Sequence, residues 1–180
     1  MTDPEAMALA LCLLFDSRSD RLVRELWSRL EARGVRTLET HTHGRHHPHL
    51  SYAVLIDGDP GAVRAAVADL PDAGPVELTV QGTITFPRGR AALACSVPSA
   101  VAARQERVVA ALEGTGAVLH RHYLPGRWVP HVSVATRATG DGLAVVVNEV
   151  SDVLPLTVRA ERCALIDTST GQLWPVDGIP

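Results

Sequence analysis

The hydrophobic and polar positions of this chain change repeatedly between a strand pattern and a helix pattern. Residues 7–15 form a continuous apolar run that is short enough for a buried strand. Apolar residues then recur at helical spacing, at Leu22, Val23, Leu26 and Leu30. Asp16–Ser17 and Ser19–Asp20 supply residues that can cap the start of this helix, and Gly34 can end it. We therefore expect a strand over residues 7–15, followed by a helix that ends near Gly34.

The rest of the chain repeats this alternation. Further strands are expected over residues 49–57, 76–86, 90–97, 129–136 and 156–167, with a short final strand through Leu173 and Trp174. Further helices are expected to begin at Gly58–Pro60 and at Pro98–Ser99, and to span residues 141–153. The order strand, helix, strand, helix, strand therefore occurs twice.

The two halves of the chain also share a motif. An offset of 82 residues aligns residues 44–51 with residues 126–133, and five of these eight positions are identical. The match falls at the same place in two equivalent series of strands and helices, which favours a duplication over chance. We predict a single two-lobed domain over residues 1–180, with an internal repeat of approximately residues 6–87 and 90–177.

Each copy of the motif places a histidine and a serine on one strand. Side chains on a strand alternate between its two faces. The residues expected to share a face are His49, Ser51 and Ala53 in the first strand, and His131, Ser133 and Ala135 in the second. A pseudo-twofold axis between the lobes would bring these two faces opposite each other across a groove.

A pair of histidines with two hydroxyls suits phosphoryl transfer without a metal ion. An unperturbed imidazole pKa near 6.5 allows one histidine to be neutral while the other is protonated. One can then act as the base and the other as the acid, and each proton transfer is typically worth about 10²–10⁴ in rate. Serine hydroxyls can donate hydrogen bonds where negative charge develops. We expect kcat/KM to pass through a maximum near neutral pH.

These motifs resemble the paired His-x-Thr/Ser motifs of the two-histidine phosphoesterases, also called the 2′-5′ RNA ligase-like family. Residues 128–135 are similar to the second motif of that family, although serine stands at both positions where threonine is common. The resemblance implies an α+β fold of two pseudo-symmetric lobes. Each lobe would be an antiparallel sheet with helices packed outside, around a central active-site groove.

The same resemblance implies an activity. Members usually hydrolyse 2′,3′-cyclic phosphates of RNA ends or small nucleotides to 2′-phosphates, without a metal or other cofactor. It implies that one histidine activates water and that the other protonates the leaving ribose oxygen. We assign His131 as the base and His49 as the acid, and the pseudo-symmetry leaves the opposite assignment open.

Six further residues are expected to bind the substrate: Ser51, Ser133, Arg45, Arg127, Tyr123 and Trp128. The two arginines each stand four residues before a motif histidine, where a guanidinium could reach a phosphate. The two aromatic residues could stack a base. Tyr52 alternates with the motif side chains and is expected to pack behind its strand.

Charge and composition narrow the partners. The net charge of −3 argues against bulk electrostatic binding of nucleic acid and favours a short substrate over a long RNA. Together with the resemblance, this implies an RNA terminus or a small cyclic nucleotide as substrate. All 17 basic residues are arginine, and the absence of lysine excludes a P-loop lysine, a Schiff base and a lysyl-nucleotide ligase. No stretch approaches the 18 apolar residues of a membrane span. We expect a monomer with no membrane partner.

Cysteine usage predicts the compartment. Cys12, Cys95 and Cys163 lie far apart in apolar runs, which is typical of free buried thiols in a reducing environment. The first residues lack the basic region and the cleavage site of a signal peptide. We therefore expect a cytoplasmic protein.

Two alternatives remain open. The first is a non-catalytic nucleotide- or RNA-binding protein on the same fold, although the presence of both histidines and both hydroxyls argues against it. The second is a metal-dependent hydrolase built on the histidine-rich run from His41 to His47. That run lacks the context that orients zinc ligands, so a flexible loop is favoured, with groove lining as a secondary possibility.

Overall fold

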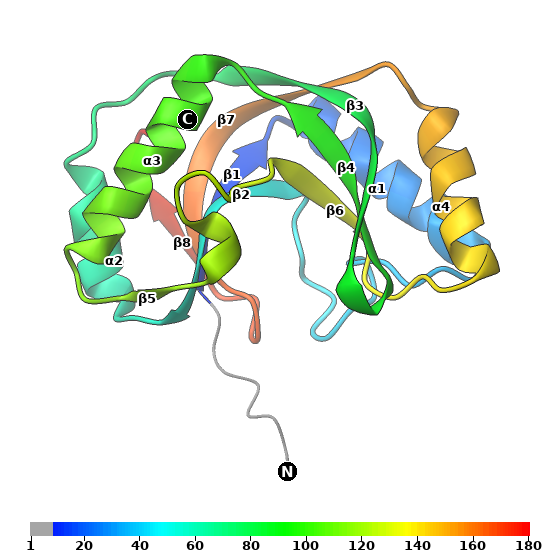
Figure 1. The fold of residues 1–180 in the computed structure, drawn as a ribbon, viewed down its shortest axis with the longest axis horizontal. Helices are drawn as coiled ribbons and strands as arrows, with labels where there is room; N and C mark the ends of the chain where they lie inside the picture. Colours follow the sequence, from blue (N-terminus) through cyan, green and yellow to red (C-terminus); the bar gives the residue numbers. More distant parts are fainter. Residues whose placement is uncertain (1–8) are drawn as a thin grey trace, which may run out of the picture.

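The computed structural model describes residues 9–180, in which helices pack on one antiparallel sheet (Figure 1). The strands are β1 (Leu9–Phe15), β2 (His49–Asp57), β3 (Val76–Phe86), β4 (Arg90–Ser96), β5 (Val118–Leu119), β6 (His131–Ala135), β7 (Leu156–Asp167) and β8 (Leu173–Val176). The α-helices are α1 (Ser17–Ala32), α2 (Pro60–Ala68), α3 (Ser99–Glu113) and α4 (Asp141–Ser151). Residues 6–8, which the sequence analysis includes in the repeat and partly in the first strand, lie outside the described residues.

The elements predicted from the sequence are confirmed, and β2, β3 and β7 have the predicted bounds. The sequence pattern missed β5 and two single turns, η1 (Pro87–Gly89) and η2 (Arg121–Tyr123). Segments of two or three residues are too short to show a period.

Helix α1 shows why these predictions succeed. The Asp16 carboxylate accepts a hydrogen bond of 2.7 Å from the Ser19 backbone N–H and so caps the helix. The buried side chains of the helix are Ser19, Val23, Leu26, Trp27 and Leu30, which form one face. Gly34 has a φ of 80° and follows the helix end, where a residue with a side chain would be strained.

The strands form one continuous sheet in the order β5-β2-β1-β7-β3-β4-β6, and β8 pairs with β7. Strand β7 joins the two parts of this sheet. It pairs with β1 from Ala160 to Asp167 and with β3 from Leu156 to Ala160. The expected α+β fold with antiparallel strands is confirmed, and the pairing of β7 with β3 connects the two expected sheets edge to edge.

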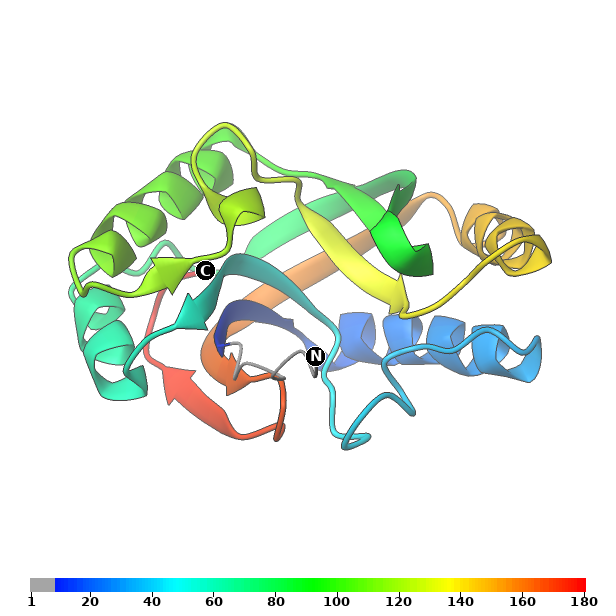
Figure 2. The ribbon, with the colours of Figure 1, turned by 60° about the horizontal axis from the view of Figure 1, so that its bottom comes forward.

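The sheet curves until strands from its opposite ends meet. Strands β2 and β6 lie side by side without pairing, as Figure 1 and Figure 2 both show. Helices α2 and α3 lie beside β2, β5 and β8, while α1 and α4 lie beside β3, β4 and β6 (Figure 1). The strands that carry the two histidine motifs therefore face each other.

Each face of the sheet has its own set of buried side chains. The main core lies on the helix-covered face and includes Leu11, Leu13, Leu50, Leu93 and Val132. A smaller cluster lies on the opposite face and contains Ala10, Cys12, Leu14, Ala164 and Ile166. We call this opposite face the site face, because His49, Ser51, His131 and Ser133 also project from it. None of the helices in residues 9–180 is long and apolar enough to cross a membrane.

The turn between β3 and β4 fixes the chain that follows β6. The Ala138 backbone N–H donates a 2.6 Å hydrogen bond to the Gly89 carbonyl. Gly89 has a φ of 74°, and a Cβ atom there would lie 2.5 Å from the Ala138 carbonyl oxygen. Only glycine allows both this positive φ and this close approach of the Ala138 carbonyl. Gly89 thus permits the hydrogen bond that holds the chain after β6 against the turn.

Candidate active site

His49 and His131 occupy matching positions, each as the first residue of its strand. The Nδ1 atom of His49 lies 2.6 Å from the His47 carbonyl oxygen, and that of His131 lies 2.7 Å from the Val129 carbonyl oxygen. A carbonyl oxygen can only accept, so Nδ1 carries the proton in both rings. The Nε2 atom of each ring is therefore the one left to accept or donate a proton.

Burial lowers the pKa of both histidines below the ordinary value of 6.5. The hydrogen bond from Nδ1 to the backbone carbonyl opposes this effect in each ring, because it favours the charged form. The charge of His49 lowers the pKa of His131 further. The two imidazoles are thus close enough to interact and resist being protonated together.

The serine of each motif lies two residues after the histidine, on the site face. Ser51 is paired with Cys12 across β1 and is 7% exposed, and its Oγ lies 3.6 Å from the Cys12 Sγ. Burial raises the pKa of Tyr123 to about 12, an effect that a hydrogen bond with Ser51 partly opposes. Ser133 is partly buried and is paired with Ala92, a small residue that leaves room above the strand.

Both motif strands carry a β-bulge directly after the serine. In β2 the pairing with β1 skips Tyr52, and in β6 the pairing with β4 skips Val134. These two residues are also 82 positions apart. A bulge bends its strand and changes the direction of the side chains that follow it.

The bulges correct one prediction from the sequence. Ala53 and Ala135 were expected to share the face of the histidines, and this is wrong because both pack in the main core. Each bulge inserts one residue, which reverses the alternation beyond it. Tyr52 packs behind its strand as predicted and is fully buried.

Side chains from distant segments hold the backbone at both bulges. The Trp128 Nε1–H donates to the Ser51 carbonyl, and the Trp27 Nε1–H donates to the Ser133 carbonyl, each at 3.0 Å. Gln105 on α3 donates to the Tyr52 carbonyl at 3.1 Å. Trp27 and Gln105 were not predicted as site residues, because a helical pattern indicates only that such residues are buried.

Gln105 also donates a 2.7 Å hydrogen bond to the Tyr123 carbonyl, and so joins η2 to the bulge of β2. The Trp128 ring lies 6.0 Å from the Tyr52 ring, and Trp128 is partly buried against the main core. Of the two aromatic residues expected to stack a base, Trp128 is thus engaged in structure, while Tyr123 lies beside Ser51.

The structure separates the two arginines expected to bind phosphate. The Arg45 guanidinium donates a 2.5 Å hydrogen bond to the Thr170 carbonyl, in the turn between β7 and β8. Arg127 is exposed in the segment before β6. Arg90, which the sequence analysis missed, lies near enough to Tyr123 for its charge to lower the pKa of that hydroxyl. Alternation along β4 places Arg90 on the site face with Ala92 and would have indicated it.

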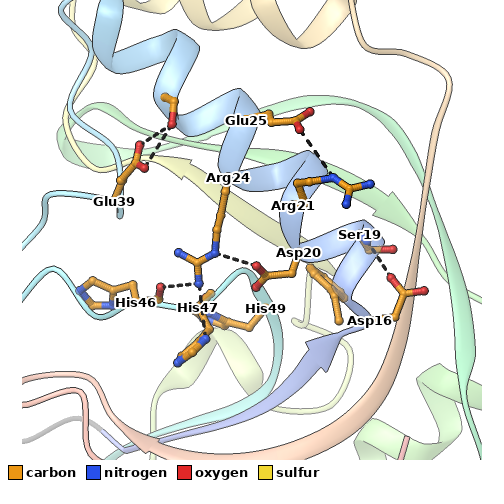
Figure 3. Close-up of polar contacts among 12 residues, drawn as sticks. Asp16, Ser19, Asp20, Arg21, Arg24, Glu25, Glu39, His46, His47 and His49 are labelled. Atoms are coloured by element: carbon orange, nitrogen blue, oxygen red, sulfur yellow. Dashed lines mark hydrogen bonds and ion pairs between the residues drawn. The ribbon is translucent and has the colours of Figure 1, made fainter.

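Arg24 on α1 holds the segment that enters β2, as Figure 3 shows. Its Nε donates to the Asp20 carboxylate at 2.6 Å, and its Nη2 donates to the His46 carbonyl at 3.2 Å. Nη2 also lies 3.5 Å from Nδ1 of His47. These contacts hold the backbone three residues before His49 and the side chain two residues before it.

The histidine-rich run packs on itself and on the turn between β7 and β8. The rings of His43 and His46 are 4.2 Å apart, and the ring of His43 lies against Gly171. Burial, together with the charges of His43, His41 and His49, lowers the pKa of His46 to about 4. Within residues 9–180, no three histidine, cysteine, aspartate or glutamate side chains are grouped to hold a metal ion.

The fold is similar to three solved structures. Kluyveromyces marxianus Usb1 is 14% identical with a TM-score of 0.51, over 95% of this chain and 98% of that chain. The structure of the same protein with uridine monophosphate is 16% identical to this chain, with a TM-score of 0.51, over 96% of this chain and 99% of that chain. A phosphoesterase is 12% identical to this chain, with a TM-score of 0.56, over 96% of this chain and 95% of that chain. At these identities the likeness shows the fold alone, and no curated protein matches the sequence significantly.

The sequence itself matches a known family over most of its length. The match is to the 2′-5′ RNA ligase superfamily and extends over residues 18–172. That range includes both histidines, both serines and both bulges. The expected resemblance is therefore confirmed, and the chain belongs to the 2′-5′ RNA ligase superfamily of two-histidine phosphoesterases.

Proposed function

We propose that this protein is an enzyme that hydrolyses 2′,3′-cyclic phosphates of RNA ends or small nucleotides to 2′-phosphates, without a metal ion or other cofactor. The main support for this proposal is the matched pair of imidazoles. In each ring Nδ1 is hydrogen-bonded to a backbone carbonyl, which leaves Nε2 for proton transfer. In an in-line displacement at phosphorus, one of these imidazoles can act as the general base and the other as the general acid. Membership of the 2′-5′ RNA ligase superfamily supports phosphoester chemistry.

In the proposed reaction, neutral His131 accepts a proton from water at Nε2 while the water oxygen bonds to phosphorus. The bond between phosphorus and O3′ breaks, and protonated His49 donates its Nε2 proton to the leaving O3′. The product carries a 2′-phosphate and a free 3′-hydroxyl. The net reaction adds one water, and the two imidazoles exchange protonation states, which solvent then restores.

The hydroxyls and one guanidinium would hold the phosphate during this step. Ser51 and Ser133 lie one on each motif strand and can donate to its two non-bridging oxygens, where negative charge develops. Arg90 lies on the site face near Tyr123 and can balance the remaining charge. We assign the base or ribose of the substrate to Tyr123, because the Trp128 ring packs against Tyr52 and the main core.

The test is phosphorus NMR of a 2′,3′-cyclic nucleotide incubated with the protein in EDTA. Wild type, His49→Ala and His131→Ala should be compared, with His122→Ala as a control because His122 is exposed and outside both motifs. We expect conversion to the 2′-phosphate by wild type and by the control, and a loss of about 10²-fold or more in each motif variant.

Other outcomes would overturn parts of this proposal. Formation of the 3′-phosphate would show that O2′, and not O3′, is the leaving oxygen. Activity that requires added zinc would favour a metal site in the histidine-rich run. Binding of nucleotide without conversion under any condition would favour the alternative of a non-catalytic nucleotide- or RNA-binding protein.

We also propose a reducing, cytoplasmic setting and a monomeric state. All three cysteines are free, and burial raises the pKa of each thiol, to about 12 for Cys12 and Cys95. Inert buried thiols are typical of reducing compartments. Within residues 9–180 the exposed large hydrophobic side chains are few, namely Ile56, Val118, Val129 and Val147, which supports a monomer.

A further inference from the structure

Three strands place an arginine in register with the histidine of the first motif. Leu14 on β1 is paired with His49 on one side and with Arg162 of β7 on the other. Residues that are directly paired in an antiparallel sheet project from the same face. Strands are spaced by about 5 Å, so Arg162 lies roughly 10 Å from His49 along the site face. A single nucleotide can bridge this distance.

Arg162 has donors to spare for a ligand. Its Nη2 donates to the Phe15 carbonyl at 3.1 Å, and its Nε lies 3.9 Å from the Glu161 carboxylate. The side chain is 63% exposed. A guanidinium carries five N–H donors in a rigid fork that matches a phosphate, and most of those of Arg162 remain available. Burial, with the charge of Arg24, lowers the pKa of His47 in the segment before His49, and the charge of Arg162 adds to this effect.

A cavity of about 380 Å³ opens directly beside Arg162. It lies where the edge of β7 changes partner, because β3 pairs as far as Ala160 and β8 begins to pair at Cys163. Leu14 and Ala164 of the site-face cluster form part of its lining, together with Leu173, which packs against that cluster. The cavity is therefore continuous with the face that carries His49.

The chemistry of this cavity suits a nucleobase. Its volume is within the range of small-molecule sites, and its apolar walls can contact the flat face of a ring. Asp72 and Asp177 stand at its exposed rim and can accept hydrogen bonds from exocyclic amino groups. The arrangement thus offers an apolar slot with acceptors beside one guanidinium.

We infer that Arg162 and this cavity form a subsite for a second nucleotide, in which Arg162 binds the phosphodiester next to the reacting phosphate and the cavity holds the neighbouring base. The inference rests on the proposed function and names its substrate class. The preferred substrate is an RNA end of at least two nucleotides, and a free cyclic mononucleotide occupies only the histidine site.

The test compares a dinucleotide that ends in a 2′,3′-cyclic phosphate with the corresponding cyclic mononucleotide. Wild type should show a higher kcat/KM on the dinucleotide. Arg162→Gln should lower that value by about 10- to 100-fold and leave the mononucleotide unchanged. Arg33→Gln is the matched control, because Arg33 is 59% exposed and is tied to Glu149 on α4 instead. Leu173→Trp, which fills the cavity, should also remove the preference.

A binding measurement separates failure of this subsite from failure of the proposed reaction. Titration with a dinucleotide 2′-phosphate and a mononucleotide 2′-phosphate reports the subsite whether or not the protein turns over. Tighter binding of the dinucleotide, lost in Arg162→Gln but not in Arg33→Gln, supports the subsite. Equal binding of the two ligands, or equal loss of both in Arg162→Gln, overturns it.

Discussion

Replacing Trp27 with phenylalanine tests whether remote side chains position the catalytic histidines. Trp27 is fully buried on α1, and its Nε1–H donates to the carbonyl of Ser133 at 3.0 Å. Phenylalanine keeps an aromatic ring at this place and removes the donor. The Ser133 carbonyl belongs to the bulged part of β6, two residues from His131. The variant therefore perturbs the strand of the site without touching a side chain of the motif.

The size of the effect follows from the buried carbonyl. A buried acceptor that loses its partner costs about 1–3 kcal/mol. At about 2–4 °C per kcal/mol for a chain of this size, we expect the melting temperature to fall by about 2–12 °C. A shift of about 1 Å in a catalytic group can cost about 10²-fold in rate, so kcat should fall by about 10-fold or more. KM should change less, because the groups that hold substrate remain present.

The assay measures kcat, KM and melting temperature for Trp27→Phe and for Trp174→Phe. Trp174 lies partly buried on β8 against the main core and so controls for the loss of indole volume. We expect Trp174→Phe to keep the wild-type kcat. A Trp27→Phe variant that melts earlier but turns over at the wild-type rate would show that Trp27 only stabilises the fold, and would refute the positioning role.

Three further predictions concern charge and pH. Because the pKa values of His49 and His131 are both lowered, the form with one protonated ring is most populated below pH 6.5. We therefore expect kcat/KM to peak below pH 6.5 rather than near neutrality. A value of kcat/KM that rises through pH 9 would contradict acid–base catalysis by this pair. The pKa of His46 is about 4 in the folded protein, so the unfolded chain binds more protons than the folded one between pH 6.5 and pH 4. The contribution of His46 to stability should therefore be complete above pH 6.5 and should fall as the pH is lowered to 4. In His46→Asn, the melting temperature should fall less over the same pH range. Arg90→Gln should lower kcat/KM by about 10- to 100-fold and Arg127→Gln by less, with the reverse order counting against Arg90 as the phosphate ligand.

The sequence was sufficient for the α-helices, for all strands except β5, and for the two motifs. Continuous apolar runs, caps such as Asp16 and the turn residue Gly34 are local signals, so β1 and α1 could be recognised without knowledge of the tertiary structure. The histidines and serines were recognisable because two copies of the motif reinforced each other. The repeat over approximately residues 6–87 and 90–177 remains a proposal, which the matching bulges at Tyr52 and Val134 support.

The surroundings of the site depend on pairing between distant strands, which no local pattern reveals. Arg45 stands four residues before His49, and yet its guanidinium binds the turn between β7 and β8. Arg162 is 113 positions from His49 in the sequence, and register brings it into the same row. The bulges arise in the same way, because one extra residue in a strand becomes visible only against its partner strand.

The hydrogen bonds at the two bulges connect each motif to the other half of the chain. Trp27 comes from the first helix and fixes the strand of His131, whereas Trp128 comes from the segment before β6 and fixes the strand of His49. Each half of the chain thus supplies the donor that holds the motif of the other half. Neither motif is fixed until both halves have folded and packed together. Because acid–base catalysis needs both imidazoles in place at once, this exchange couples the activity to the complete fold, and damage at either tryptophan should impair the whole reaction rather than one proton transfer.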